Sequence, residues 1–95
     1  MNKGYLIFTV TTANGSIPVE NALIELSFGS TSLSCKTDMR GFSERFEIIF
    51  ESDSPPCLSG SAAVSCRGFK DSFVDKIKVY RNVTVVRIVN LDRIL

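Results

Sequence analysis

Apolar and polar side chains alternate along most of this chain, and this alternation restricts its fold more than any other feature. The clearest case is the segment about 4–12, where Leu6, Phe8 and Val10 share one face. Side chains of a β-strand alternate between two faces, whereas an amphipathic helix repeats every three or four residues. No window of about 11 residues or more carries the helical repeat. The sequence therefore predicts an all-β protein.

The same alternation returns in further segments separated by turn residues. In the segment 22–28, Ala22, Ile24 and Leu26 are expected to face inward. The remaining strands are expected at about 33–37, from Phe42 through Phe46 to Ile48, at 61–67, through Phe73, Ile77 and Val79, and from Val83 to Leu91. Seven short strands with turns at intervals of roughly 8–12 residues predict an antiparallel, Greek-key β-sandwich.

Asp38 and Gly41 are the best-defined turn residues in the sequence. Aspartate at the first position and glycine at the fourth suit a type I turn followed by a left-handed glycine. We expect Asp38–Gly41 to join two strands as a hairpin with a bulge. Further along, Gly68 and Phe69 are expected to interrupt a strand, with the glycine forming a kink before an aromatic residue.

Other turns are indicated by composition. Asn14-Gly15 marks a turn after the first strand, because such turns need positive φ angles. Arg81-Asn82 is expected to turn the penultimate strand back into the last one, giving a long apolar hairpin. The segment 51–60 carries two prolines, three serines and a glycine, so it is expected to be the longest loop.

Length and composition indicate one domain covering residues 1–95. The chain has 95 residues, of which 44% are hydrophobic and 22% charged, as in ordinary globular proteins. This length supports one hydrophobic core and is too short for two. Intrinsic disorder and a disulfide-dense miniprotein are both excluded by this composition.

The charge balance gives no sign of a polyanionic partner. The 11 basic and 10 acidic residues leave a formal charge of +1, so neither nucleic acid nor a membrane surface is an expected partner. Residues 1–60 hold 4 basic and 7 acidic side chains, whereas residues 61–95 hold 7 basic and 3 acidic ones. Ion pairs between facing strands explain this difference better than a site for a polyanion.

The absence of histidine weighs against catalysis. Histidine is the commonest general base and metal ligand, and this chain has none. Its serines lack both a histidine and a Ser-x-x-Lys motif. We therefore expect no enzyme activity, no catalytic residue and no cofactor.

Three cysteines, Cys35, Cys57 and Cys66, cannot all pair within one chain. Free thiols are typical of a reducing compartment. Cys35 and Cys66 alternate with inward apolar residues, whereas Cys57 follows Pro55-Pro56 and is the candidate exposed thiol. Three isolated cysteines do not supply the four ligands of a structural zinc site, so no metal is expected.

The first residues predict a strand and not a secretory leader. Threonines interrupt the apolar run that follows Lys3, and no stretch reaches the roughly 20 apolar residues that span a bilayer. We expect the chain to be cytoplasmic as synthesised, with association with a spore or a phage-like particle as a further option.

Several motifs together resemble a known family. They are Gly4-x-Leu6-x-Phe8-x-Val10, Pro18-Val19-x-x-Ala22-x-Ile24-x-Leu26, Thr37-Asp38-x-x-Gly41 and Val64-x-Cys66-x-Gly68-Phe69. Their order and spacing resemble the carboxypeptidase-regulatory-like, transthyretin-like (prealbumin-like) domains, and the likeness spans nearly the whole chain. The resemblance implies a seven-stranded accessory β-sandwich without a zinc ion of its own. One enzymatic branch of that superfamily depends on histidine, which this chain lacks.

A narrower resemblance involves the segment from Ser16 to Ala22, the Ser54-Pro55 loop and the tail from Ile77 to Leu91. These look like the small N-terminal domain of clostridial spore-cortex-lytic proteins and its free-standing relatives. In those proteins the module is ancillary to peptidoglycan cleavage. The resemblance therefore implies a standalone relative or an excised domain, with peptidoglycan as an expected partner.

Two kinds of binding site, for calcium and for a glycan, have simpler structural explanations. Loop carboxylates of Asp38, Glu51 and Asp53 resemble a calcium site, but the turn already explains Asp38. Aromatic residues that could stack on a glycan are more often core or cross-strand residues; they are Tyr5, Phe69, Phe73 and Tyr80.

Two functions remain. The first is an interaction module that binds a protein or cell-wall partner through a sheet edge or the loops at 12–21, 51–60 and 69–76. The second is a structural subunit that self-associates through its edge strands.

Overall fold

The computed structural model describes residues 2–94, and these form eight β-strands in two four-stranded sheets. The strands are β1 (Asn2–Thr12), β2 (Ile17–Pro18), β3 (Leu23–Phe28), β4 (Thr31–Lys36), β5 (Phe46–Phe50), β6 (Cys57–Ser65), β7 (Ser72–Tyr80) and β8 (Thr84–Asn90). The described residues contain no helix that is long and apolar enough to cross a membrane. The predicted all-β sandwich is confirmed, with the very short β2 as an additional strand.

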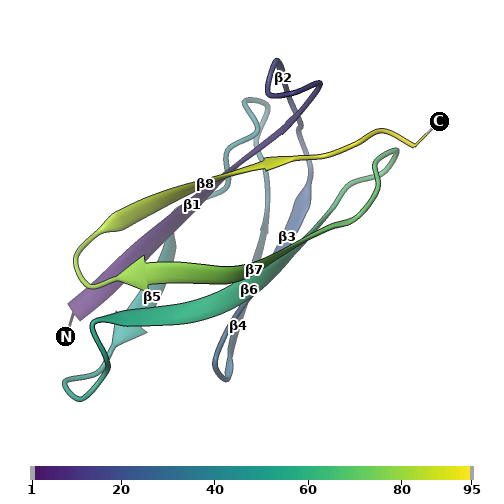
Figure 1. The fold of residues 1–95 in the computed structure, drawn as a ribbon. Coiled ribbons are helices and arrows are strands. Elements are labelled where there is room, and N and C mark those ends of the chain that lie inside the picture. The colour runs from purple at the N-terminus through teal and green to yellow at the C-terminus, as the bar shows by residue number, and fades with distance from the viewer. Residues whose placement is uncertain (1, 95) are drawn as a thin grey trace.

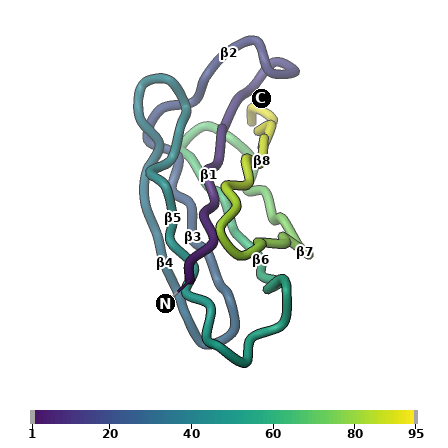
Figure 2. Tube along the Cα trace, turned by 90° about the vertical axis from the view of Figure 1, so that its left-hand side faces the viewer, coloured from purple at the N-terminus to yellow at the C-terminus, as the bar shows by residue number. Residues whose placement is uncertain are grey.

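The two sheets have different central strands (Figure 1). In the first sheet β1 lies at the centre, with β5 and β2 along one edge and β8 along the other. The second sheet has the order β4-β3-β6-β7 and is antiparallel throughout. Figure 2 shows β7 and β8 together on one side of the sandwich, and β4 and β5 together on the opposite side.

The core lies between the sheets and follows from the alternation. Leu6, Phe8 and Val10 of β1 are fully buried, as the sequence predicts. Phe8 meets Phe46 of β5 edge to face, with ring centroids 6.1 Å apart. The second sheet contributes the inward residues Ala22, Ile24, Leu26, Phe28, Ala62, Val64, Ile77 and Val79.

The turn at Asp38 has the predicted local geometry but a different role. The Asp38 carboxylate accepts hydrogen bonds from the backbone N–H groups of Arg40 and Phe42, and Gly41 has a φ of +82°. The expected hairpin is wrong, because β4 belongs to one sheet and β5 to the other. The turn therefore carries the chain between the two layers of the sandwich.

The predicted final hairpin is also wrong. The strand β8 does not pair with β7 but crosses to the first sheet, where it pairs parallel with β1 from Tyr5↔Thr84 to Thr11↔Asn90. The sandwich is consequently mixed and not purely antiparallel. Turn residues at 81–82 fit either outcome, because they reverse the chain without selecting the sheet that it joins.

A bulge in β7 explains why Phe73 is exposed. Gly60 pairs with Ile77 and Ala62 pairs with Val74, so Ser61 faces two residues of β7. The extra residue shifts the alternation by one position. Ile77 is therefore buried, whereas Phe73 is 68% exposed despite having the same parity.

The predicted loop 51–60 is shorter in the structure. Strand β6 begins at Cys57, so the connection spans residues 51–56. Cys57 pairs with Tyr80 of β7 and is a strand residue, not a loop residue.

Candidate interaction surface

The described sheets have four outer edges, formed by β4, by β5 with the short β2, by β7 and by β8. Strand β7 is broken by its bulge and carries Lys76 and Lys78, which are features that discourage further pairing. Strand β5 has five residues, and β4 is mainly polar. Strand β8 has seven residues in continuous register, without a proline or a bulge. It is therefore the edge best suited to receive another strand.

The orientation of the β8 peptide groups follows from its hydrogen bonds at both ends. The Tyr5 N–H donates to the Val83 carbonyl at 2.9 Å, and the Leu91 N–H donates to the Thr11 carbonyl at 2.7 Å. Odd-numbered residues of β8 therefore bond β1, because peptide groups alternate sides along a strand. The N–H and C=O groups of the even-numbered residues, 84 to 90, point away from β1 and have no backbone partner among residues 2–94.

Side chains beside this edge form an apolar strip on the outer face of the first sheet. Val86 is 56% exposed and Ile88 is 73% exposed. Val86 pairs in register with Ile7, and Thr9 lies between Ile88 and Phe42. We define the apolar strip as Ile7, Phe42, Val86 and Ile88. Exposed apolar side chains gathered in this way are typical of interaction sites.

The other half of the same face is mainly polar apart from the exposed Ile49, and its charged groups contact one another. Lys3 Nζ donates to Glu47 Oε1 at 2.7 Å, and the Arg45 guanidinium lies 4.3 Å from the centre of the Tyr5 ring. The hydrogen bond and the opposite charge lower the pKa of Glu47 and raise the pKa of Lys3. This half of the face offers fewer unmatched groups to a partner than the apolar strip does.

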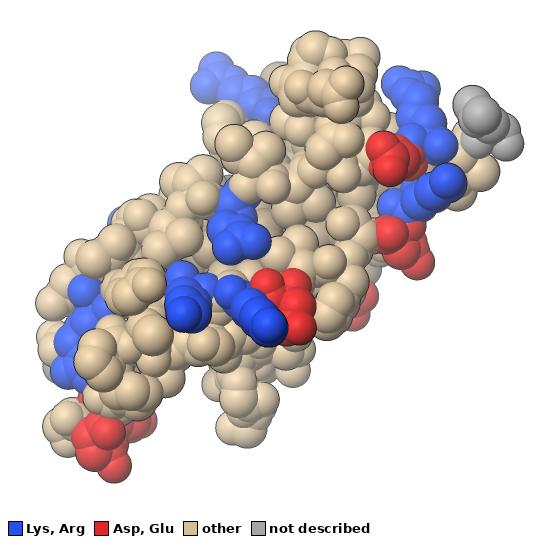
Figure 3. All heavy atoms as spheres, viewed as in Figure 1, with Lys and Arg blue, Asp and Glu red and all other residues tan. Residues whose placement is uncertain are grey.

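Basic side chains gather on the side of the molecule formed by β7 and β8. Figure 3 shows a group of blue side chains over these two strands, with one red group beside it. The basic residues of the two strands are Lys76, Lys78 and Arg87, and Asp75 is their one acidic residue. Arg87 is half-buried, whereas both lysines are exposed.

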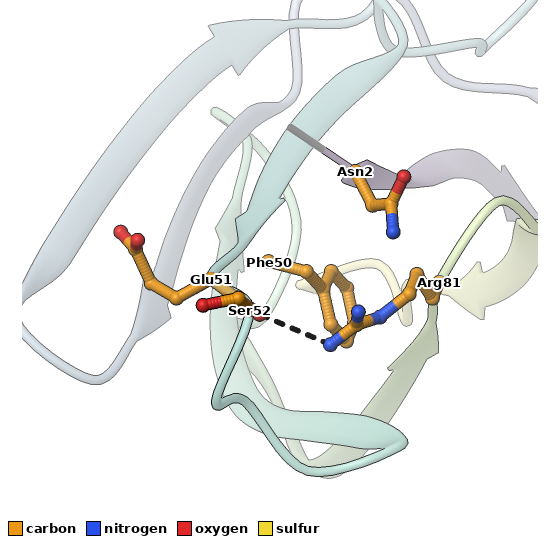
Figure 4. Close-up of a pocket in the computed structure, with 5 residues that line it drawn as sticks. All are labelled: Asn2, Phe50, Glu51, Ser52 and Arg81. Carbon is orange, nitrogen blue, oxygen red and sulfur yellow. Dashed lines mark hydrogen bonds between the residues drawn. The ribbon is translucent and has the colours of Figure 1, made fainter.

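A shallow hollow lies where the β7–β8 turn meets the 51–56 connection (Figure 4). It has a volume of about 430 Å³ and is lined by Asn2, Phe50, Glu51, Ser52 and Arg81. Arg81 lies over the Phe50 ring and donates to the carbonyls of Glu51 and Ser54 at 3.1 and 3.3 Å. Arg81 therefore holds the 51–56 connection in place. This structural role explains the position of Arg81 in the hollow, so no ligand is needed to explain it.

A larger hollow lies between the edges of β4 and β5. It has a volume of about 560 Å³, and Leu33, Ile48 and Leu58 contribute to its lining. Glu47 and Glu51 also line it, so this side of the sandwich is more acidic than the β7–β8 side. Sequence reasoning missed this hollow because its lining residues come from segments far apart in the chain.

Both predicted glycine turns contain glycines with positive φ, +82° at Gly41 and +90° at Gly68. Phe69 packs against the core and pairs with Arg93, whose guanidinium lies 5.6 Å from the centre of the Phe69 ring. The turn at Gly68 therefore connects to the segment that follows β8. These residues shape the fold and lie away from the apolar strip.

All three thiols are free and partly buried. Cys57 is therefore not set apart from Cys35 and Cys66 by its exposure. Burial raises the pKa of the Cys35 thiol, which keeps it protonated and weakly nucleophilic at neutral pH. The Cys66 thiol donates to the Glu20 carbonyl at 3.7 Å.

The three predicted binding loops do not form one surface. The turn at residues 13–16 follows the end of β1 that meets the end of β8, and the Gly68 turn lies beside the segment after β8. The 51–56 connection precedes β6, so it lies at the opposite end from the Gly68 turn, which follows β6. A partner that used all three loops would have to span the long axis of the molecule, which measures 47 Å.

Two aromatic residues considered for glycan stacking are engaged, since Arg45 covers Tyr5 and Arg93 covers Phe69. Phe73 and Tyr80 are exposed on β7. Among residues 2–94, no group of three or more His, Cys, Asp or Glu side chains is arranged to hold a metal ion.

The apolar strip beside the β8 edge could have been suspected from one sequence signal. Val85 and Val86, and likewise Ile88 and Val89, place apolar side chains at adjacent positions. A strand that is apolar on both faces needs a partner on each face. The contribution of Ile7 and Phe42 could not be foreseen, because it depends on which strands are neighbours.

Comparison with known proteins gives the fold and no family. No profile of a known protein family matches the chain, and no curated protein sequence matches it. The Bacillus anthracis TIE protein superposes with a TM-score of 0.70 and 16% identity, over 98% of this chain and 17% of the other. The minor pilin GBS52 of Streptococcus agalactiae superposes with a TM-score of 0.66 and 13% identity, over 99% and 46%.

An enzyme is also among the structures with this fold. The 3-chlorocatechol 1,2-dioxygenase of Rhodococcus opacus 1CP superposes with a TM-score of 0.59 and 12% identity, over 95% of this chain and 60% of the other. This chain therefore spans less than two thirds of each of these three proteins. At these identities the likeness is one of fold, because one β-sandwich carries unrelated functions.

Proposed function

We propose that this chain is a non-catalytic interaction module that binds an extended polypeptide strand along β8. The observation that carries the proposal is the free edge from Thr84 to Asn90, with Val86 and Ile88 exposed beside it. Addition of a strand to an open sheet edge is a common mode of peptide recognition. The lack of histidine and the raised pKa of the Cys35 thiol support the non-catalytic part of the proposal.

We further propose that the module is accessory to a cell-wall or spore protein. This finer proposal draws on the resemblance to the spore-cortex-lytic N-terminal domain and to carboxypeptidase-regulatory-like domains. A minor pilin with the same fold adds support for a structural or surface role. Retention on insoluble peptidoglycan above that of a control β-sandwich is expected. Equal retention of the two proteins would contradict the cell-wall role while leaving the strand-binding role intact.

A second candidate is a structural subunit that assembles through its own edges. It is favoured by the two open edges of the first sheet, on β5 and β8, which would allow head-to-tail pairing. Size-exclusion chromatography with light scattering, over a hundredfold concentration range (on the order of 1–100 μM), separates the two candidates. A constant mass near 10.5 kDa is expected for the interaction module, whereas a larger assembly would favour the subunit.

A further inference from the structure

Arg87 lies in the middle of the β8 edge and has no acidic partner among residues 2–94. Its side chain is directed toward the inner side of the sheet, because Val86 and Ile88 on either side of it point outward, and it is half-buried. The ion pair found among residues 2–94 is Lys3–Glu47, and no side-chain hydrogen bond in this range involves Arg87. A half-buried charged group has lost part of its hydration, so a partner of opposite charge stabilises it.

The neighbouring edge strand adds to this positive charge. Strand β7 contacts β8 and contributes the exposed Lys76 and Lys78, against the single carboxylate of Asp75. Figure 3 shows blue, basic side chains gathered over β7 and β8. A strand that paired with β8 would therefore have one face beside the apolar strip and the other beside Arg87, while the β7 lysines add positive charge nearby.

We propose that the β8 edge selects an extended strand whose side chains alternate between apolar and acidic. This proposal rests on the interaction role proposed above and specifies the chemistry of its partner. Apolar side chains of the incoming strand lie beside Val86 and Ile88, where cross-strand contacts stabilise the pairing. Its acidic side chains lie on the inner side, beside Arg87.

The β8 strand of a second copy of this chain fits the edge less well. Antiparallel pairing of β8 with β8 of another molecule brings two copies of Arg87 to the same face of the joint sheet. Like charges on neighbouring strands are destabilising. The charge distribution therefore favours an acidic partner over pairing of β8 with a second β8.

The probes that test this proposal are three end-capped, fluorescein-labelled heptapeptides. One alternates valine with glutamate, one alternates valine with lysine, and one alternates valine with threonine. Each is titrated with the purified protein and followed by fluorescence anisotropy. We expect the valine–glutamate peptide to bind at least about tenfold more tightly than the valine–lysine peptide, with the neutral peptide in between.

Three variants identify the site of binding. Val86→Pro removes an outward N–H that does not bond β1, so the fold is retained while strand pairing is blocked; circular dichroism checks the fold. Arg87→Glu is expected to reverse the preference, so that the valine–lysine peptide binds more tightly. Lys36→Glu makes the same change in net charge on the exposed edge of β4 and is expected to leave the preference unchanged.

The outcomes separate this proposal from the one on which it rests. Equal binding of all three peptides, lost in a folded Val86→Pro variant, would overturn the acidic preference and retain β8 as a binding edge. An equal effect of Lys36→Glu and Arg87→Glu would also overturn it, because net charge alone would then explain the preference. Failure of every peptide to bind would count against both proposals.

Discussion

Gly41 occupies a position that no other residue fits without strain. Its φ is +82°, and a Cβ atom there would overlap the Val10 carbonyl oxygen, which lies on the neighbouring strand β1. The Gly41 carbonyl accepts the Val10 N–H at 2.8 Å, so the turn cannot easily move away from β1. The passage of the chain from the second sheet to the first depends on this close approach.

A matched pair of glycine substitutions separates the two causes of strain. Gly68 has a φ of +90° but open space where a Cβ would lie. We expect Gly68→Ala to lower the free energy of unfolding by about 1 kcal/mol, which is the cost of the backbone angle. Gly41→Ala should lower it by about 2–4 kcal/mol, because a steric overlap is added. Urea unfolding measures both values, and equal losses would show that the contact with Val10 is unimportant.

The Lys3–Glu47 ion pair gives a pH dependence whose direction is set by the shifted pKa values. The pKa of Glu47 is lowered from 4.5, so its contribution to stability is present above pH 4.5 and is lost as the pH falls through the lowered value. The pKa of Lys3 is raised from 10.5, so its contribution is present below pH 10.5 and is lost as the pH rises above it.

The Glu47→Gln variant tests this direction. The difference in free energy of unfolding between the native chain and the variant should be constant between about pH 6 and about pH 9 and should shrink in acid. Both groups are exposed, so about 1 M salt should reduce the difference at every pH. A difference that grows as the pH falls below 4.5 would contradict the assignment of the pair.

At the scale of elements, the bulge in β7 decides which side chains this strand buries. Lys76 has a φ of +55°, an angle that is unfavourable for a residue with a Cβ atom, and its N–H bonds the Asp75 carboxylate at 2.8 Å. The bulge turns Phe73 outward and Ile77 inward, so that β7 changes face midway along its length.

Glycine at the bulge should relieve this backbone strain. We expect Lys76→Gly to raise the free energy of unfolding by about 0.5–1 kcal/mol. Lys78→Gly is the control, because Lys78 lies in regular strand and glycine there should lower stability by about the same amount. Thermal or urea unfolding distinguishes the two, and a loss of stability in both variants would argue against the bulge at Lys76.

The sequence predicted the positions of the strands better than their partners. Alternation is a local property, so the buried faces of β1 and β3 were predicted correctly at Leu6, Phe8 and Ile24. Pairing is not local, because a turn at Asp38 or at residues 81–82 can lead to either sheet. The bulge was missed for a related reason, since a shift in parity becomes visible only against the partner strand β6.

At the scale of the whole molecule, the two sides of the sandwich differ in character. The β7–β8 side carries the basic residues Lys76, Lys78 and Arg87, whereas Glu47 and Glu51 line the hollow on the β4–β5 side. The excess of basic residues after position 60 was visible in the sequence. The sequence did not show what this excess does. Ion pairs between facing strands were the expected explanation, but one ion pair, Lys3–Glu47, is found among residues 2–94, and both of its residues precede position 60.

The sequence predicted that the binding surface could be a sheet edge, but not which strand forms that edge. A sheet edge was among the expected sites, but the choice of β8 depends on its parallel pairing with β1. That pairing turns the even-numbered peptide groups outward and brings Val86 beside Ile7. The predicted loops lie at opposite ends of the molecule, so they contribute less than the edge to a common surface.

Strand β8 is an edge strand whose backbone pairs with β1 along one side. Amide hydrogen exchange, measured by NMR at residues 84–90, tests this most directly. We expect slow exchange at Val85, Arg87 and Val89, whose N–H groups bond β1. We expect fast exchange at the four even-numbered residues, Thr84, Val86, Ile88 and Asn90. Uniform protection of all seven amides in the isolated monomer would show that the edge is covered, and would contradict the claim.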